Sequence, residues 1–330
     1  MQPTVSVDRS HVPPREVLEA RKRMNDAVRQ YFDARSFLEV ETPIAVPSPG
    51  LEPHLEAFST EEIGPDRRSE RLFLHTSPEY AMKRMLGRDL GHLYQLARVF
   101  RNGERSRTHA PEFTMLEWYR MPGLLEDVMD DTEELIQQVA AAVGGPWHPH
   151  GARRLSVSEA FTRVGLGDPL AFPDLSELQV ALQVPPHPGD SWEDVFFRAF
   201  LDRVENTFAN DEITLLYGYP ARMAALARID PADPRRAERF EVFLGRMELG
   251  NAFGELTDPL EQRRRFEQDQ SDRLAAGKEV YPIDEGLLQD LAKIHTNAAG
   301  IAIGLDRLLM RCLGVPAIQD VLCFSPREVS

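Results

Sequence analysis

Residues 93–119 constrain the fold most, because two apolar segments are joined there by a polar loop. The first segment ends in Phe100-Arg-Asn-Gly-Glu, and the second begins after Pro111 and reads Glu-Phe-Thr-Met-Leu-Glu-Trp-Tyr. Short apolar and aromatic runs interrupted by Asn-Gly are typical of two antiparallel strands and their connection. Side chains alternate between the faces of a strand. We therefore expect Phe113, Glu117 and Tyr119 to share one face of the second strand.

This hairpin has two interpretations. It combines aromatic rings with a carboxylate, and Arg101, Arg107 and His109 lie in or beside its loop. Rings can stack on a base, cations can bind phosphates, and a carboxylate can pair with an amine. One interpretation is therefore a surface for a nucleotide and an amine. The other is a half-exposed sheet with a solvated loop, and the hairpin alone favours neither.

A second hairpin is predicted at residues 238–258, where acidic residues stand beside glycines. With a two-residue turn at Gly245-Arg246, Phe243 would pair with Glu248, and Glu241 with Gly250. Glu241 and Glu248 would then be diagonal neighbours on one face, spaced to share a hard cation such as the magnesium of a nucleotide triphosphate. An exposed acidic hairpin is the alternative. The glycines favour a site, because they allow a ligand to approach the backbone.

Two further patterns extend these predictions. Asn251, Phe253 and Glu255 continue the alternation beyond the glycines of the second hairpin. Residues 299–310 read as a buried strand that passes through glycines into a helix, with Arg307 in its first turn. A glycine-rich strand–helix junction is a weak signal by itself. An arginine that projects from it toward a phosphate is a stronger one.

The remaining sequence predicts mostly structural elements. We expect a helix after Pro13-Pro14, a short strand at 37–43, a strand from 72 that leads into a helix near Glu79, and a long helix at 124–143 closed by Gly144. Residues 155–237 begin with a capping box, Ser156-Val-Ser-Glu159, and contain a strand-like run at 213–219. We interpret 155–237 as an elaboration on the main sheet, without a catalytic cluster.

Composition limits the function. The chain has 330 residues, 42% of them hydrophobic, which suffices for one large or two small domains. A net charge of −15 argues against nonspecific nucleic-acid binding. Cys312 and Cys323 have no metal-ligand spacing, residues 1–14 lack an apolar signal core, and no run is long enough to span a membrane. We expect a reduced, cytoplasmic protein without a membrane partner.

Taken together, these stretches resemble class II aminoacyl-tRNA synthetases of the lysine type. Phe37-Leu-Glu-Val-Glu-Thr-Pro43 is similar to motif 1, Phe100-Arg-Asn through His109-Ala-Pro-Glu-Phe113 to motif 2, and Gly300-Ile-Ala-Ile-Gly-Leu-Asp-Arg307 to motif 3. They occur in the family's order over nearly the whole chain. Only 36 residues precede motif 1, so we expect no anticodon-binding domain. A core of this kind resembles the EpmA family (also called PoxA or GenX), the elongation factor P–(R)-β-lysine ligases.

The resemblance implies an α+β fold, in which an antiparallel sheet flanked by helices forms one catalytic domain over residues 1–330. It also implies a homodimer, ATP with Mg²⁺, (R)-β-lysine and elongation factor P as substrates, and no tRNA. The enzyme would form an aminoacyl-adenylate and pass the acyl group to a lysine side chain of elongation factor P. The alternatives are a truncated synthetase that charges tRNA with L-lysine and a non-catalytic regulatory paralogue.

The resemblance also implies roles for individual residues. Arg101 and Arg307 would be catalytic, and ATP would contact both of them. The further ATP contacts would be Asn102, Gly103, Glu104, His109, Phe113, Glu248, Leu249 and Gly304. Glu241 and Glu248 would hold magnesium. The amino acid would contact Ser77, Pro78, Glu79, Tyr119, Asn251, Glu255 and Ala302, with its two ammonium groups at Glu79, Tyr119 and Glu255.

Three positions depart from the lysyl-tRNA synthetase pattern. Gly103 stands where motif 2 carries a glutamate, and Glu104 beside it is a candidate substitute. Ala110 replaces the loop asparagine before the proline. Ala302 replaces the central glycine of motif 3, and its methyl group would narrow the amino-acid pocket. The EpmA family shares that alanine, so Ala302 favours a β-amino acid over α-lysine.

Overall fold

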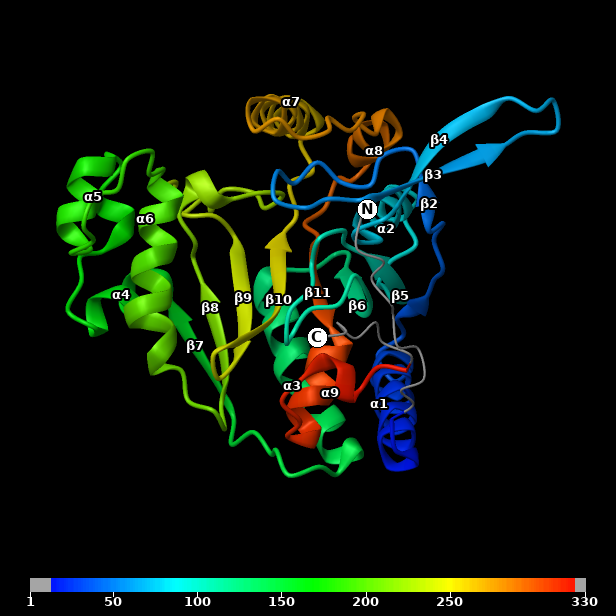
Figure 1. Cartoon of the computed structure of the whole chain (residues 1–330), viewed down its shortest axis with the longest axis horizontal. Coiled ribbons are helices and arrows are strands. Elements are labelled where there is room, and N and C mark those ends of the chain that lie inside the picture. Colours follow the sequence, from blue (N-terminus) through cyan, green and yellow to red (C-terminus); the bar gives the residue numbers. More distant parts are fainter. Residues whose placement is uncertain (1–12, 324–330) are drawn as a thin grey trace, which may run out of the picture.

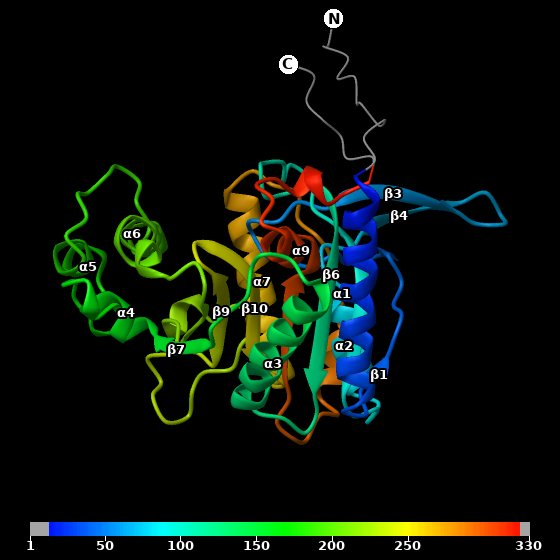
Figure 2. The same ribbon diagram turned by 90° about the horizontal axis from the view of Figure 1, so that it is seen from below.

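A large sheet with helices on both faces organises the computed structural model, which describes residues 13–323 (Figures 1 and 2). The sequence of residues 1–14 has no apolar signal core, and residues 1–12 of that segment lie outside the described range. The strands are β1 Leu38–Glu39, β2 Ala45–Val46, β3 Phe58–Ile63, β4 Ser69–Leu74, β5 Leu93–Phe100, β6 Glu112–Arg120, β7 Ala152–Ser156, β8 Ile213–Tyr217, β9 Arg239–Leu244, β10 Met247–Gly254 and β11 Ala299–Gly304. The helices are α1 Arg15–Asp33, α2 Glu79–Leu86, α3 Leu125–Val143, α4 Val157–Arg163, α5 Leu175–Ala181, α6 Trp192–Ala199, α7 Pro259–Ala275, α8 Glu285–Leu291 and α9 Leu305–Leu313.

The large sheet has the strand order β1-β5-β6-β11-β10-β9-β8-β7. Neighbouring strands of this sheet are antiparallel except at its two edges, where β1 is parallel to β5 and β7 is parallel to β8. The predicted α+β class with an antiparallel sheet flanked by helices is confirmed, and the parallel edges are an addition to it. A smaller sheet, β2-β4-β3, carries a hairpin that projects from the body of the molecule (Figure 1).

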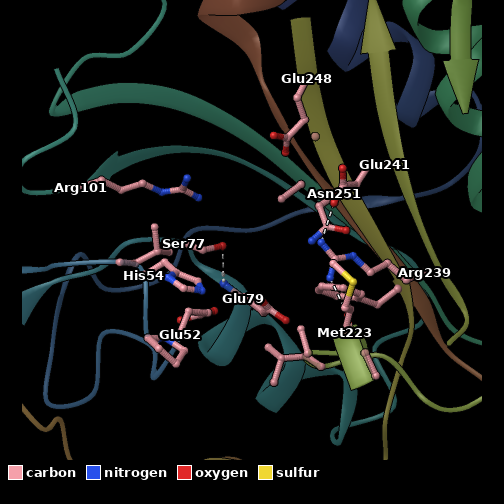
Figure 3. A pocket seen from close by; sticks show the side chains of 18 of the residues that line it. Glu52, His54, Ser77, Glu79, Arg101, Met223, Arg239, Glu241, Glu248 and Asn251 are labelled. Carbon is pink, nitrogen blue, oxygen red and sulfur yellow. Dashed lines mark hydrogen bonds and ion pairs between the residues drawn. The ribbon is translucent and has the colours of Figure 1, made fainter. Parts of the chain in front are cut away.

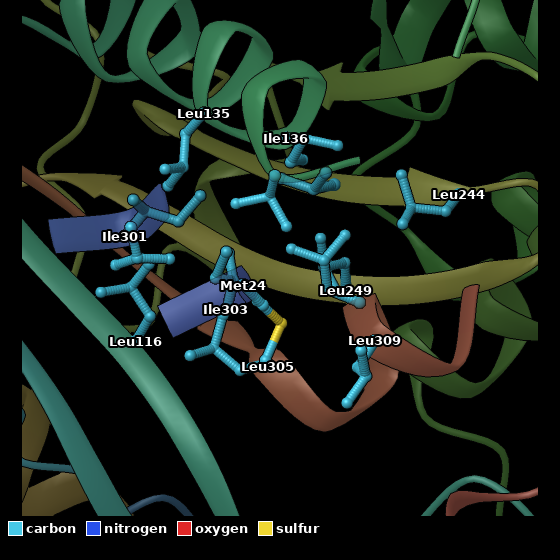
Figure 4. Close-up of a cluster of buried hydrophobic side chains, with 14 of the residues drawn as sticks. Met24, Leu116, Leu135, Ile136, Leu244, Leu249, Ile301, Ile303, Leu305 and Leu309 are labelled. Carbon is cyan, nitrogen blue, oxygen red and sulfur yellow. The ribbon is translucent and has the colours of Figure 1, made fainter. Parts of the chain in front are cut away.

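Three helices, α1, α3 and α9, cover one face of the large sheet (Figure 2). Their apolar sides pack on alternate residues of the central strands, including Leu116 and Trp118 of β6 and Ile301 and Ile303 of β11. Figure 4 shows this core, with α3 lying across the strands. Because side chains alternate along a strand, the residues between these core positions face the opposite side of the sheet.

The opposite face is covered at its two ends and open between them. At the β7–β9 end, α4, α5 and α6 enclose an aromatic core that includes Phe161, Phe196 and Phe243. At the β5–β6 end, α2, α7 and α8 pack around Tyr80, Phe266 and other apolar side chains. The strands between the two clusters therefore expose polar side chains to a space that the helices border but do not fill.

Most predicted elements are present, and several end elsewhere than expected. Helix α1 follows Pro14, α3 ends at Gly144 in the left-handed conformation (φ 68°), and Ser156 and Glu159 form the predicted capping box of α4. The strand predicted at 37–43 is only β1, two residues long, and the strand predicted at 213–219 ends at Tyr217. Within residues 13–323, none of the helices combines the length and apolarity needed to cross a bilayer.

Candidate active site

A cavity of about 1250 Å³ occupies the open part of the sheet face. Arg101, Glu248, Glu255 and Arg307, which come from three separate segments, all line it. The other predicted site residues on its wall are Ser77, Glu79, Glu104, His109, Phe113, Tyr119, Glu241, Leu249, Asn251, Ala302 and Gly304. Pro78, Asn102 and Gly103 are not part of the wall. Figure 3 shows side chains from the strands on one side and from α2 and the loop after β2 on the other.

The floor of the cavity contains a row of side chains that crosses four strands. Glu241 of β9 pairs with Asn251 of β10, which pairs with Ala302 of β11, which in turn pairs with Glu117 of β6. Directly opposed residues in antiparallel strands lie on the same face. The Ala302 methyl group therefore lies between the Asn251 amide and the Glu117 carboxylate. No other side chain stands between these two polar groups in the row.

A second row on the same face, two residues further along each strand, explains the glycine at position 300. Phe253 pairs with Gly300, and Gly300 pairs with Tyr119. A Cβ atom on Gly300 would lie 2.3 Å from the Tyr119 ring, so any larger residue would push the tyrosine aside. Glycine here allows the phenol to lie flat across β11. The ring can then reach Glu117.

A β-bulge in β10 corrects the predicted register. Phe243 pairs with Glu248 as expected, but Glu241 pairs with Asn251 and not with Gly250, because the register shifts between Glu248 and Gly250. A bulge inserts one extra residue and reverses the alternation beyond it. Without it, Glu248 and Asn251 would point to opposite faces. The bulge places both on the cavity wall, together with Phe253 and Glu255.

The amine-binding end predicted at Glu79 and Glu255 already contains a cation. The ammonium group of Lys83 lies 2.6 Å from Glu79 Oε1 and 2.5 Å from Glu255 Oε2, and the Lys83 side chain is 3% exposed. Burial opposes ionisation, but the two carboxylates outweigh it and raise the pKa of Lys83, so the amine stays charged. Burial also raises the pKa of Glu255 to about 7, with Lys83 acting in the other direction.

Glu117 is the carboxylate of this end that forms no ion pair with any residue between 13 and 323. Its oxygens accept hydrogen bonds from Ser77 Oγ at 2.6 Å and from Tyr119 Oη at 2.5 Å. It is 1% exposed. Burial, followed by the charge of Glu79, raises the pKa of Glu117 to about 8. A cationic ligand would favour its ionised form. The prediction that Phe113, Glu117 and Tyr119 share one face is confirmed, since all three line the cavity.

Cations gather at the other end of the cavity. Arg307 donates to the backbone carbonyls of Thr108 and Glu248, at 3.1 and 2.7 Å, and contacts His109 Nε2. The β5–β6 loop is thereby fastened to the start of α9. Burial and then the charge of Arg307 lower the pKa of His109, which favours the neutral imidazole. Helix α9 begins at Leu305, directly after Gly304, so Arg307 lies in the first turn as predicted.

Arg101 lies at the start of the β5–β6 loop. Its guanidinium carbon is 5.3 Å from the centre of the Phe113 ring, within cation–π distance. Its Nε donates to the Thr76 carbonyl oxygen at 3.3 Å, and Glu104 is 3.8 Å away. Gly103 adopts φ +80°, a left-handed conformation that disfavours the glutamate of motif 2 at this position. Glu104 faces the cavity instead.

Glu241 and Glu248, the pair predicted to hold magnesium, lie on one face of the sheet, as expected. Burial and then the charge of Glu241 raise the pKa of Glu248 to about 7. Two carboxylates that repel in this way are suited to a divalent cation. Glu241 itself is 2.6 Å from Arg239, which the sequence analysis overlooked. In the described part of the chain no three His, Cys, Asp or Glu side chains are grouped to hold a metal, so phosphate oxygens would have to supply further ligands.

Other residues of the wall were not predicted from the sequence. Lys83 is one helical turn after Glu79, a spacing that signals an ion pair on a helix. Glu52 and His54 come from the loop after β2 and carry no motif (Figure 3). Residues 155–237 were interpreted as structural, yet Met223 from this segment also lines the cavity and accepts a hydrogen bond from Arg239 through its carbonyl group.

Comparison with known proteins identifies the family. The family model for tRNA synthetases class II (D, K and N) matches residues 6–328. The elongation factor P–(R)-β-lysine ligase of Vibrio parahaemolyticus is 38% identical over 329 residues, which cover 98% of this chain and 97% of the relative. The ligase of the same name from Edwardsiella ictaluri is 40% identical over 303 residues, covering 90% and 91%. The chain therefore belongs to the class II tRNA synthetase family of the D, K and N type, and within it to the elongation factor P–(R)-β-lysine ligases.

Proposed function

We propose that this protein uses ATP to activate (R)-β-lysine as an aminoacyl-adenylate and transfers the acyl group to a lysine side chain of elongation factor P. One observation carries the proposal. The amine-binding end contains three carboxylates and one resident ammonium, Lys83. Glu117 and Glu255 are buried, and the Glu79 side chain is 14% exposed. With all four ionised, three negative charges minus one positive charge leave an excess of two. Two substrate ammonium groups would balance that excess, whereas a neutral amino acid would leave buried charge uncompensated.

In the first step the substrate carboxylate attacks the α-phosphorus of ATP. A C–O–P bond forms, and the bond to pyrophosphate breaks. We place Arg101 at the α-phosphate and the substrate carboxylate, Phe113 against adenine, and His109 and Arg307 at the terminal phosphates. The enzyme would act by positioning the reactants and by stabilising the negative charge that develops on phosphate oxygens.

Magnesium fits the residues present, because Glu241 raises the pKa of Glu248 and a cation between them would relieve that repulsion. When bound, Mg²⁺ would offset phosphate charge. Glu248 and Glu241 would hold it, and Arg239 would hold Glu241 in place.

In the second step the acceptor amine attacks the carbonyl carbon of the adenylate. A C–N bond forms, the C–O bond to AMP breaks, and AMP leaves with the electron pair. The specificity for the β-isomer would rest partly on Ala302, whose methyl group lies between Asn251 and Glu117. An α-amine and a β-amine differ by one carbon in their distance from the carboxylate. A methyl group on the pocket floor can therefore favour one of them.

The experiment measures both steps in the same preparation. We expect (R)-β-lysine to stimulate ATP–pyrophosphate exchange more than L-lysine does. We also expect incubation with ATP, (R)-β-lysine and the cognate elongation factor P to raise the intact mass of the factor by one acyl group. Exchange with no lysine isomer would contradict any ligase. Acylation of tRNA with L-lysine, without modification of the factor, would favour a synthetase.

We further propose a cytoplasmic homodimer. Leu38, Ile44 and Leu90 are 50%, 43% and 43% exposed, and they lie in or near the segment that resembles motif 1. Exposed apolar side chains of this kind are typical of interfaces. Sedimentation equilibrium of the wild type and of Ile44→Glu tests the dimer, and we expect the variant to shift toward the monomer. The free thiols of Cys312 and Cys323 fit a reducing compartment.

A further inference from the structure

The loop between β2 and β3 brings a carboxylate to the cavity that the proposed mechanism does not yet use. Glu52 and His54 lie across the cavity from Glu241 and Glu248 (Figure 3). The Oε2 atom of Glu52 is shielded from solvent and has no hydrogen-bond partner among residues 13–323. A buried, unpaired carboxylate oxygen is costly in a folded protein, and such atoms are often satisfied only when a ligand is bound.

The backbone around Glu52 is held in place. Its carbonyl oxygen accepts a hydrogen bond from Arg273 Nη1 at 2.9 Å, and Arg273 is completely buried. The amide of Leu51 donates to the Tyr80 hydroxyl at 3.2 Å, and Thr76 Oγ1 donates to the Pro49 carbonyl oxygen at 2.9 Å. The backbone that carries the Glu52 carboxylate is therefore held by several hydrogen bonds, so an ill-defined loop does not account for the unpaired Oε2 atom.

The charges around Glu52 place it between the reacting centre and α7. Burial and then Glu79 raise its pKa, whereas a hydrogen bond from its own backbone amide, followed by the charges of Arg101 and Lys83, lowers it. On the other side, burial and then Glu52 raise the pKa of Asp269, on α7, to about 7. The titratable and charged groups facing Glu52 are thus Glu79, Tyr80 and Lys83 of α2, Arg101 after β5, and Asp269 of α7.

Helix α7 and the loop between β2 and β3 both contribute to the wall of the cavity that contains Glu52. Gln268, Asp269 and Asp272 of α7 line it, as do Pro53, His54 and Leu55 of the loop. An ammonium group that enters between the loop and α7 would come close to both Asp269 and Glu52, and Glu52 in turn is close enough to Arg101 to feel its charge. A cation near Asp269 and Glu52 would favour their ionised forms, because burial and the charge of Glu52 raise the pKa of Asp269.

We propose that Glu52 is the general base that receives the proton of the acceptor lysine, and that the passage between the loop after β2 and α7 admits its side chain. This inference rests on the proposed function, in which an amine is the second nucleophile. A lysine side chain is protonated near neutral pH and must lose a proton before it can attack. The nitrogen first loses one proton to the Glu52 carboxylate and then attacks the carbonyl carbon to form the C–N bond. The C–O bond to AMP breaks with its electron pair on AMP, and the departing phosphate takes the second proton of the nitrogen.

The alternative partner for Glu52 is an ammonium group of the substrate, because Glu79, which is expected to bind that group, lies close to Glu52. The three carboxylates of the amine-binding end are already balanced by Lys83 and the two ammonium groups of the substrate. Glu52 is a fourth carboxylate, and no positive charge in that count remains to balance it. It also arises from the wall opposite the sheet, beside the route along α7. These two features favour the acceptor amine.

The test separates the two chemical steps in Glu52→Gln, which keeps the shape of the side chain. Adenylate is formed first with ATP and (R)-β-lysine, and elongation factor P is then added in a single turnover. We expect ATP–pyrophosphate exchange to remain within a few fold of the wild type, which also shows that the variant folds. We expect transfer to slow by about 10²-fold or more, the usual contribution of a general base. Hydroxylamine, already neutral near pH 7, should trap the adenylate equally well in both proteins.

A matched control is Glu193→Gln, which removes one carboxylate from the rim, where Glu193 pairs with Arg222 at 3.0 Å. It should leave transfer unchanged. Wild-type transfer rates in Glu52→Gln would overturn the inference. So would a KM for (R)-β-lysine raised tenfold in exchange with normal transfer from preformed adenylate, because Glu52 would then hold the substrate amine. Failure of the wild type to catalyse either step would instead contradict the proposed function.

Discussion

The ammonium group of Lys83 lies 2.5 Å from Glu255 Oε2, and both side chains are at most 3% exposed. Lys83 also contacts Glu79 at 2.6 Å. The protein thus contains its own cation at the end of the cavity where a diamine acid is expected to bind. The Coulomb attraction between such groups offsets the cost of removing them from water only while every partner is present.

Lys83→Met should destabilise the protein. Methionine keeps most of the volume but leaves Glu79 and Glu255 facing each other without a cation. We expect the free energy of unfolding to fall by about 3–5 kcal/mol, the range for removing one partner of a buried pair. Urea unfolding followed by circular dichroism measures it. Lys22→Met, which removes an exposed i,i+4 pair with Asp26, should cost less than about 0.5 kcal/mol. Equal losses in both variants would mean that Lys83 adds nothing by being buried.

Binding of (R)-β-lysine should release protons. Burial raises the pKa of Glu117 to about 8 and that of Glu255 to about 7, so both are partly protonated near pH 7 in the ligand-free protein. Ammonium groups favour the ionised carboxylates, so the bound protons leave. Titration calorimetry in buffers of different ionisation enthalpy measures this release. Glu117→Gln should release fewer protons than the wild type, and a heat independent of buffer would contradict the prediction.

The stability of the ligand-free protein should decrease as pH rises through neutrality. Glu117, Glu248 and Glu255 have folded-state pKa values of about 8, 7 and 7, above those of an unfolded glutamate. The unfolded chain then holds fewer of these protons, and stability is lost as pH rises from about 4.5 through the folded pKa values. Urea midpoints between about pH 5 and 8 measure the trend. The loss should be smaller with (R)-β-lysine present, because the ligand stabilises the ionised carboxylates.

Glu248→Gln should raise the magnesium concentration needed for adenylate formation. The substitution removes one of the two carboxylates predicted to hold the cation, while Glu241 stays paired with Arg239. We expect at least a tenfold increase in the half-saturating magnesium concentration for ATP–pyrophosphate exchange, because one charged ligand of the cation is lost. A tenfold change corresponds to about 1.4 kcal/mol of binding free energy. Glu70→Gln, at an exposed position of β4, is the control. An unchanged magnesium dependence would remove Glu248 from the metal site.

Ala302→Gly should weaken discrimination against L-lysine. The methyl group between Asn251 and Glu117 would be lost, and the floor of the pocket would deepen. One methyl-sized group is worth about 10–200-fold in specificity, so we expect the ratio of kcat/KM for the two isomers to change within that range. Ala252→Gly, buried on the opposite face of β10, controls for the cost of glycine in a strand. If both variants changed the ratio equally, Ala302 would not be the cause.

The β5–β6 hairpin could be predicted because its information is local. Apolar periodicity, the Asn-Gly break and strand alternation together placed Phe113, Glu117 and Tyr119 on one face, and the pairing of β5 with β6 confirms the hairpin. The junction at Gly304 that places Arg307 in the first turn of α9 is local in the same way.

The register of β9 and β10 could not be predicted, because a bulge has no reliable local signal. The turn at Gly245-Arg246 fixed the first pair, but the extra residue before Gly250 changed every later one. Extrapolation from the turn alone would therefore point Asn251 and Glu248 to opposite faces of the sheet, whereas both line the cavity. Only pairing with β9 on one side and β11 on the other fixes which residues face the cavity.

The two hairpins, the family and the predicted site residues that line the cavity could be inferred from the sequence alone, because each depends on neighbours within a few positions or on motifs in a fixed order. What those residues contact depends on tertiary folding. Lys83 reaches Glu255 across 172 positions of the chain, and Glu52 comes to Arg101 from a loop without a motif. Charge balance and burial arise where distant segments converge, and the pKa values and the unpaired carboxylate depend on that convergence.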